Sequence, residues 1–306
     1  MSPTLERMTT PEEALEKIHA RFGAHDGHRA LHAKGVHCTA TFTATLEAAE
    51  LSRAGHLSGE TVQAKVRFSN GGGDPTVPDY APDVRGLAVS WVLPDGSRTD
   101  LLSQTLPYFP SRDVDGFFAA LAISKPGLGA ALRLPGFVAK YPKAVRRLPE
   151  TNATLNSRVG FAARRYFPFH AFRFVDADGG SRYVRYAWLP LVEEAEPAKA
   201  EVRALGRDYL FDDLRDRLEQ GPVRMLLAVQ VADDGDDPSD PSSPWPHDRR
   251  RVELGTLEVT GIDDDADDGI VFDPMRLTDG IEPSDDLVLR YRPDVYSLSY
   301  ARRTQT

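Results

Sequence analysis

Two short stretches near the ends of the chain combine residue types that could transfer a proton and bind a metal. The first, HRALHAKG, places Arg29 and His32 just before a run of alternating residues. Imidazole titrates near neutrality, which is what a proton-transfer group needs. The second, RYRPDVYSLSYARR, places Arg292 four residues before Tyr296, so both side chains share one helical face. A guanidinium favours the phenolate form of a neighbouring tyrosine, and a phenolate is a hard ligand suited to ferric iron.

A strand and a C-terminal helix are the elements expected to position these groups. Residues 36–45 alternate between apolar residues and threonines, which indicates a strand with one buried face. The threonine face could line a cavity with polar edges. Cys38 lies on the apolar side, where a small buried role is expected. Residues 294–303 should be helical.

The rest of the sequence predicts an α+β fold. A helix is expected over 10–23, with Thr10 as N-cap, Glu13 completing a capping box and Gly23 ending it. We expect one antiparallel closed β-barrel of about eight strands with surrounding helices. The chain would form a single domain, 1–306, with an N-terminal helix in 1–24 and a barrel core over 25–303. Further strands are expected at 62–70, 86–92, 99–104, 170–190 (a hairpin), 223–232 and 252–261, and helices at 113–148 and 208–219.

Composition excludes several classes of partner. The net charge of −9 argues against nucleic acid, because phosphate binding needs a basic face. The acidic runs 233–240 and 263–269 are typical of solvated loops, although a calcium site stays open as an alternative. The single cysteine allows no intrachain disulfide and fits a cytoplasmic location. No apolar run is long enough for a signal peptide or a membrane span, so no membrane partner is expected.

Several motifs in one order resemble the haem-binding barrel of the catalase family. The resemblance covers about 25–303, and its weight comes from the number of pieces rather than from any one of them. The pieces are R-x-x-H-A-K-G, VRFS (66–69), RGLA (85–88), LPYFPSRD (106–113), HAFRFVDADGGSRYVRY (170–186), FDPMRLTDGIEPSDDLVLRYR (272–292) and the terminal R-x-x-x-Y.

The resemblance implies a role for each candidate residue around haem b, iron protoporphyrin IX. Tyr296 would be the axial ligand of the iron, with Arg292 paired to its phenolate. His32 would be the distal acid and base, and Ser69 would bind its far ring nitrogen and fix the tautomer.

The same resemblance implies how the cofactor would be held. Arg29 and Arg67 would bind the propionates, where bidentate pairing favours arginine, and Phe117 would stack over the porphyrin. Leu31 stands where the family often has valine. Whether Lys34, Asp83 and Arg85 touch the haem region or form structural salt links is open.

The sequence departs from full-length catalases in ways that resemble the small catalase-related peroxidases. Residues preceding His32 and following Tyr296 are few, so neither NADPH nor a tight tetramer is expected, and a homodimer is compatible with the sequence. Thr105 takes the place of the distal asparagine, unless a one-residue slip puts Gln104 there. A shorter, more open channel would admit larger hydroperoxides.

The implied function is a haem b peroxidase that reduces hydrogen peroxide or organic hydroperoxides with an organic electron donor and releases little or no dioxygen. One alternative is a hydroperoxide-rearranging enzyme of the allene oxide synthase type, which pairs a threonine with the distal histidine and would use the apolar segment 117–137 as a channel. The others are a non-enzymatic haem-binding protein and a barrel without haem.

Overall fold

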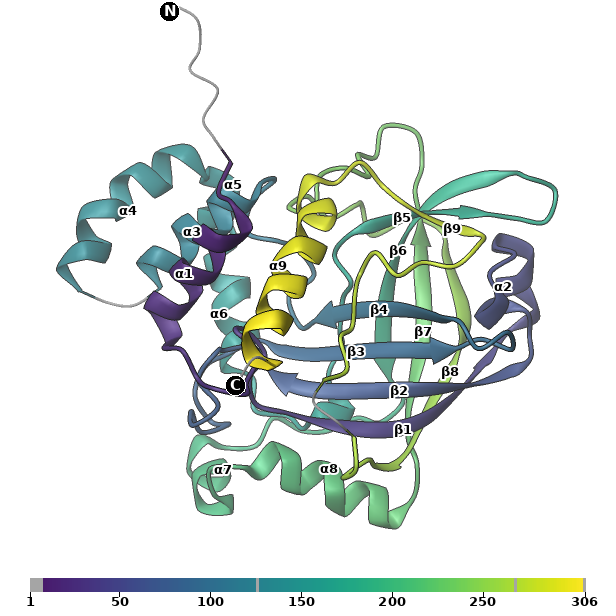
Figure 1. The fold of residues 1–306 in the computed structure, drawn as a ribbon, viewed down its shortest axis with the longest axis horizontal. Helices are drawn as coiled ribbons and strands as arrows, with labels where there is room; N and C mark the ends of the chain where they lie inside the picture. The colour runs from purple at the N-terminus through teal and green to yellow at the C-terminus, as the bar shows by residue number, and fades with distance from the viewer. Residues whose placement is uncertain (1–7, 125–126, 267–268, 305–306) are drawn as a thin grey trace, which may run out of the picture.

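A computed structural model describes residues 8–124, 127–266 and 269–304, and one nine-stranded sheet lies at its centre (Figure 1). The order of strands is β4-β3-β2-β1-β8-β7-β6-β5-β9, and all neighbours are antiparallel. The strands are β1 (Gly35–Ala44), β2 (Thr61–Asn70), β3 (Arg85–Val92), β4 (Arg98–Gln104), β5 (Ala171–Val175), β6 (Ser181–Pro190), β7 (Val223–Val231), β8 (Arg251–Ile262) and β9 (Ile281–Pro283).

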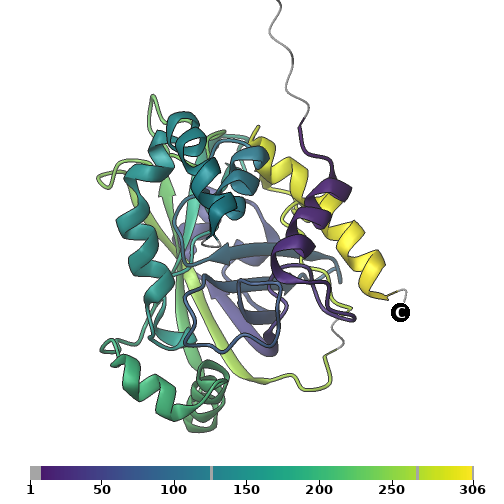
Figure 2. The ribbon, with the colours of Figure 1, turned by 90° about the vertical axis from the view of Figure 1, so that its left-hand side faces the viewer.

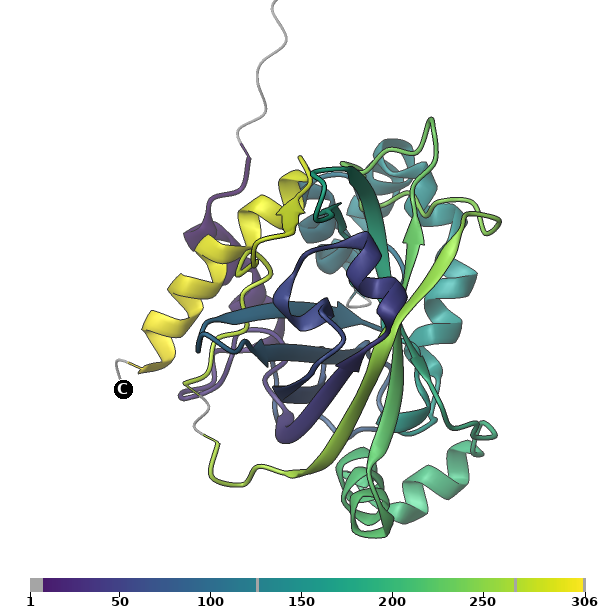
Figure 3. The same cartoon turned by 90° about the vertical axis from the view of Figure 1, so that its right-hand side faces the viewer.

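The sheet curls, but its ladder has two edges, β4 and β9 (Figures 1 and 3). No strand pair joins these edges within the described residues, so the closure expected from the sequence is not shown. Loop segments span part of the gap instead. Gln104 bridges to Phe167, and the Asp100 backbone N–H donates to the Arg276 carbonyl at 3.0 Å.

Helices gather at one end of the sheet, where α1, α3, α4, α5, α6 and α9 lie near one another (Figures 1 and 2). α7 and α8 lie apart from this group, and α1 packs on both α3 and α9. The described helices are α1 (Pro11–Phe22), α2 (Leu46–Leu51), α3 (Val114–Ile123), α4 (Leu128–Lys140), α5 (Pro142–Arg146), α6 (Leu148–Asn156), α7 (Lys199–Leu205), α8 (Tyr209–Gln220) and α9 (Leu287–Thr304). Among them, none has the length and apolar character needed to cross a bilayer.

The capping bonds predicted at the start of the chain are present. The Thr10 hydroxyl accepts from the Glu13 N–H at 3.3 Å, and the Glu13 carboxylate accepts from the Thr10 N–H at 3.0 Å. Gly23 follows the helix with a φ of 90°, a conformation that favours glycine. These local bonds satisfy backbone groups that a helix end leaves unpaired.

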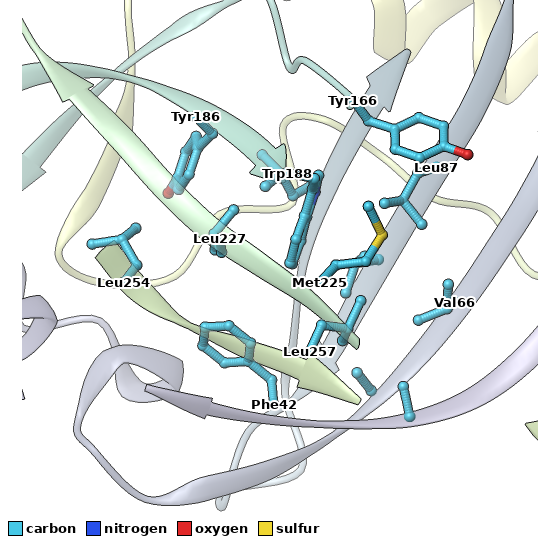
Figure 4. Packing of buried hydrophobic residues seen from close by; sticks show 14 of the residues in the cluster. Phe42, Val66, Leu87, Tyr166, Tyr186, Trp188, Met225, Leu227, Leu254 and Leu257 are labelled. Atoms are coloured by element: carbon cyan, nitrogen blue, oxygen red, sulfur yellow. The ribbon is translucent and has the colours of Figure 1, made fainter. Parts of the chain in front are cut away.

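The core fills the concave side of the curled sheet with large apolar side chains such as Phe42, Trp188 and Leu257 (Figure 4). Cys38 is fully buried in the same cluster, as expected, and burial raises the pKa of its thiol to about 12. The threonine face of β1 does not line a cavity. Thr39 and Thr43 are exposed on the outer face because the apolar side of the strand occupies the inner one.

Candidate active site

A cavity of about 340 Å³ lies between the helical end of the molecule and the edge of the sheet formed by β2, β3 and β4. Its walls come from α1, α3, α9 and the segment before β1 as well as from those strands. The lining is mostly apolar, with a few polar groups that converge on the space, which is typical of small-molecule sites. All but one of the residues given site roles from the sequence lie in this lining; the exception is Thr105.

His32 and Ser69 form one polar pair in the cavity wall. His32 Nδ1 lies 2.9 Å from the Ser69 hydroxyl oxygen, and this leaves Nε2 as the ring nitrogen available to a molecule in the cavity. His32 has a φ of 56°, the one positive value among the described non-glycine residues. Its backbone N–H is fixed by the Gly71 carbonyl at 3.0 Å, which helps to hold this rare conformation.

Gly86 of β3 provides the room for this pair. A Cβ atom at position 86 would lie 2.6 Å from the Ser69 hydroxyl oxygen and 2.7 Å from His32 Nδ1. Both distances are shorter than van der Waals contact allows. The glycine of the RGLA motif therefore leaves the space that the His32 imidazole and the Ser69 hydroxyl occupy.

The His32 imidazole is neutral at physiological pH. Burial, and to a smaller extent the neighbouring guanidinium groups of Arg67, Arg292 and Arg29, lower its pKa to about 3. A neutral ring keeps a lone pair on one nitrogen, so it can accept a proton there.

Tyr296 and Arg292 meet across one turn of α9, as their spacing predicts. The phenol oxygen accepts from Arg292 Nε at 2.9 Å and from Nη2 at 2.5 Å. Two N–H donors of a permanent cation aimed at one oxygen favour negative charge on that oxygen. Both side chains line the cavity.

Two further residues, which the sequence did not indicate, support Arg292 through its Nη1 atom. Arg292 Nη1 lies 2.9 Å from His170 Nε2, and His170 Nδ1 lies 2.5 Å from the Asp286 carboxylate. A guanidinium can only donate, so Nε2 must accept and Nδ1 carries the hydrogen. Burial lowers the pKa of His170 to about 4, which keeps this ring neutral. A lone histidine at a strand start and one aspartate in an acidic segment gave no sequence signal for this contact.

Besides Arg292, three arginines supply positive charge to the cavity. Arg29 donates to the Ile270 carbonyl at 2.7 Å, and the buried Arg67 donates to the His32 carbonyl at 3.0 Å. Arg303, near the end of α9, joins them in the lining. Sequence reasoning named the first two and missed Arg303, which lies seven residues after Tyr296 on the same helix.

An aromatic column forms another wall. Phe117 of α3 stacks on Phe109 with ring centres 5.3 Å apart, and Phe109 stacks on Phe169 at the same distance. The Arg292 guanidinium carbon in turn lies 5.8 Å from the centre of the Phe169 ring. Flat rings on this side suit a planar ligand.

Thr105 and Gln104, the two candidates for the distal amide position, take different places in the structure. The Thr105 hydroxyl accepts from the Arg85 N–H at 3.1 Å, and its side chain lies outside the cavity lining. Gln104, at the end of β4, lines the cavity instead. Thr105 directly follows the last residue of β4, so a one-residue shift in the comparison exchanges the two.

Lys34, Asp83 and Arg85 form structural links outside the lining. Lys34 pairs with Asp79 and Asp208, each at 2.5 Å, and so ties the segment before β1 to the start of α8. Arg85 lies 3.6 Å from Asp83 and donates to the Asp79 carbonyl.

Comparisons with known proteins place the chain in one family. The family model described as Catalase matches residues 14–305. The chain also shares its fold with a fungal catalase of known crystal structure, with a TM-score of 0.80 at 18% identity over 100% of this chain and 65% of that one. The protein therefore belongs to the catalase family.

Within this family the chain is similar over nearly its full length to proteins named catalase-related peroxidase. The protein of that name from Mycolicibacterium paratuberculosis is 45% identical, over 96% of this chain and 95% of the relative. The one from Synechococcus elongatus is 33% identical, over 97% and 89%. A catalase of Pseudomonas syringae is 27% identical, and the chain spans 56% of its length.

Proposed function

We propose that this member of the catalase family, an oxidoreductase that acts on peroxide, is a haem b peroxidase that oxidises an organic donor and releases little dioxygen. The supporting observation is that a neutral His32–Ser69 pair and an Arg292-bound phenol line the same cavity. One group suits proton transfer and the other suits an axial ligand. His32, Ser69, Arg292 and Tyr296 are the residues we propose for these roles.

The residues present fit haem b. Its carboxylates need cations, which Arg29, Arg67 and Arg303 supply in the lining. The porphyrin needs an apolar slot with flat walls, and Phe117 belongs to the aromatic column there. Tyr296 offers the oxygen ligand for the iron. Bound haem would supply the iron that takes oxidising equivalents from the peroxide and passes them to a donor.

In this proposal the protein's own task is to orient a peroxide and move one proton. His32 Nε2 accepts the proton of one peroxide oxygen and returns it to the other oxygen as the O–O bond breaks. Water or an alcohol then leaves. The Ser69 contact at Nδ1 keeps the ring in the tautomer with a free Nε2. Arg292 stabilises negative charge on the Tyr296 oxygen through two hydrogen bonds.

The geometry weakens the alternatives. The allene oxide synthase hypothesis requires a threonine beside the distal histidine. Thr105 lies outside the lining, so it does not meet this requirement. A protein that only stores haem has no use for a half-buried neutral imidazole in the cavity lining. Gln104, which lines the cavity, is the amide we now propose to contact the peroxide.

The deciding experiment gives haem-loaded protein hydrogen peroxide with and without a phenolic electron donor. We expect slow dioxygen release and sustained oxidation of the donor. Rapid dioxygen release without a donor would show a true catalase. Conversion of a lipid hydroperoxide without any reductant would select the rearranging alternative.

A further inference from the structure

Helix α4 stands on the surface with an apolar face that no other described element covers. Of its residues, Phe137 alone is buried, and α4 packs mainly on α3 (Figures 1 and 2). Leu128 is 79% exposed and Leu132 is 74% exposed. Four of the thirteen exposed large apolar side chains of the described residues lie on this helix; they are Leu128, Leu132, Leu134 and Val138.

Two of these four side chains, Leu128 and Leu132, belong to an exposed stripe opposite the buried Phe137, and Leu134 and Val138 lie off this stripe. Leu128, Leu132, Pro135 and Ala139 recur at spacings of four, three and four, so they lie along one face. Phe137 follows Leu128 by nine residues, which is two and a half turns and places it on the other side. The helix therefore anchors itself through Phe137 and presents leucines to solvent.

The segment that contains α4 carries only positive side chains although the chain is acidic, and one of them, Lys143, lies 3.5 Å from Asp240 outside the segment. Residues 116–149 hold six basic residues and no Asp or Glu, in a chain of net charge −9. Arg133 and Arg146 are exposed on α4 and α5. The six are Lys125, Arg133, Lys140, Lys143, Arg146 and Arg147.

We propose that α4 docks on an anionic lipid bilayer and lies in its interface. A short helix with bulky apolar residues on one face and arginine and lysine around it is the pattern that binds there. A second copy fits less well, because a two-fold interface brings each patch against itself and would bring the basic residues of both copies together. The absence of a spanning helix has no bearing on a helix that lies flat.

The side of α4 opposite the docking face packs on α3, which lines the cavity. A Cβ atom at Gly116 of α3 would lie 2.6 Å from the Tyr141 ring, which ends α4. The next residues of α3, Phe117 and Phe118, line the cavity. If the proposed function holds, on which this step rests, the substrate class would include hydroperoxides formed on lipid acyl chains.

Vesicle sedimentation tests the docking directly. We expect the protein to bind vesicles of phosphatidylglycerol and phosphatidylcholine in equal amounts, to bind pure phosphatidylcholine weakly, and to dissociate as salt rises. L128D/L132D should lower the affinity at least about tenfold, because two leucines lose their apolar contact. R133E/R146E should lower it more than about tenfold, at about fivefold per cation.

Matched controls change the same residue types elsewhere. L46D/L205D alters leucines that are 83% and 67% exposed on α2 and α7, and R203E/R251E alters exposed arginines on α7 and β8. Both should bind vesicles like the wild type. Equal binding by L128D/L132D and wild type would overturn the proposal. So would a wild-type dimer that L128D/L132D separates while vesicle binding is unchanged, since the face would then belong to a second copy.

An activity measurement separates this proposal from the function itself. L128D/L132D should slow the reduction of phospholipid hydroperoxide in vesicles about tenfold and leave the rate with hydrogen peroxide in solution unchanged. A haem-loaded protein that turns over neither peroxide would refute the proposed function, whereas the vesicle result would stand. Equal slowing of both rates would refute the assigned substrate class.

Discussion

At the scale of single residues, the His32 side chain is the most direct test of the proposed proton transfer. His32→Ala removes the imidazole that is held by Ser69 and kept neutral by burial. We expect the rate of reaction with peroxide to fall by about 10²–10⁴-fold, the usual worth of a positioned acid and base. Stopped-flow absorbance after mixing with peroxide measures the rate.

The control for this variant is His28→Ala, which removes an exposed imidazole four residues away and outside the cavity lining. It should react at the wild-type rate. Both variants should still bind haem, because neither change touches Arg292 or Tyr296. A normal rate in His32→Ala would contradict the role of the histidine.

The spacing of the residues predicted the Arg292–Tyr296 contact of the cavity, and the family resemblance predicted the His32–Ser69 contact. The Arg292–Tyr296 pair is a local helical contact, so its spacing alone suggests it. His170 and Asp286 are 116 residues apart and meet only through the fold. The sequence left Thr105 and Gln104 as alternatives because they are adjacent, and only the fold shows that Gln104 lines the cavity and Thr105 does not.

At the scale of elements, β3 must carry glycine at position 86. Gly86→Ala would push a methyl group into Ser69 and His32. We expect it to misplace the imidazole and to lower the peroxide rate by about 10²-fold. Overpacking should also cost about 1–3 kcal/mol in the free energy of unfolding. The rate and the denaturant midpoint are the two measurements.

Gly261→Ala in β8 is the matched control, since the nearest atom to its new Cβ would be the Thr39 hydroxyl oxygen at 3.7 Å. This variant should keep both the rate and the stability. If the two alanine variants behave alike, Gly86 is not needed to leave space for the His32 imidazole.

At the start of α9, Asp286 both caps the helix and supports Arg292 through His170. One Asp286 oxygen accepts from the Val288 N–H at 2.8 Å, and the other faces His170. Asp286→Asn keeps a cap acceptor but loses the charged partner of a buried ring. We expect a loss of about 1–3 kcal/mol in unfolding free energy and a changed absorption spectrum of the haem-loaded protein, because Arg292 loses its support.

The neighbouring Asp285→Asn is the control, because the Asp285 side chain is 88% exposed and pairs with Arg290 at the surface. Such a pair contributes at most about 1 kcal/mol. Equal effects of the two substitutions on stability and spectrum would show that the Asp286–His170 contact does not support Arg292.

Elements with strong local signals were predicted closely, and those that depend on tertiary contacts were not. β1, β2 and α1 follow from alternation and caps in the sequence. β9 has three residues and exists because it pairs with β5, so no local pattern indicates it. α9 begins at Leu287 rather than at 294 because Asp286 caps it. Closure of the sheet depends on its two edges and is not shown.

At the scale of the whole molecule, the cavity is built from the two ends of the chain. α1 packs on α9, and the segment before β1 brings Arg29 and His32 into the lining that also holds Arg292 and Tyr296. The curled sheet supplies Arg67 and Ser69 to the same lining. Order along the sequence indicated this meeting only through the family resemblance. The single domain, homodimer, cytoplasmic location and independence of NADPH stay predictions.

Buried neutral histidines make the stability of the whole fold depend on pH. His56 is 1% exposed, stacks on Trp91 with ring centres 4.5 Å apart, and has no partner for either ring nitrogen among the described residues. Burial lowers its pKa to about 3. The unfolded chain therefore binds a proton first as pH falls below about 6.5, and the free energy of unfolding decreases.

Other buried groups modify this dependence. The pKa values of His32 and His170 are lowered too and act in the same direction as His56. Burial raises the pKa of Asp83 and of Asp100, so these carboxyls bind protons earlier in the folded state and act in the opposite direction. A variant at one histidine is needed to isolate one contribution.

His56→Phe keeps an aromatic ring against Trp91 and removes the titrating group. Between pH 7 and pH 4.5 the wild type should lose roughly 2–3 kcal/mol more unfolding free energy than this variant, the value that a folded pKa of about 3 and an unfolded pKa of about 6.5 imply. Urea unfolding at the two pH values measures the difference. His28→Asn, at an exposed position, should leave it unchanged. An equal loss in His56→Phe and wild type would mean that His56 is solvated or paired in the folded protein, and that acid acts on the fold through other groups.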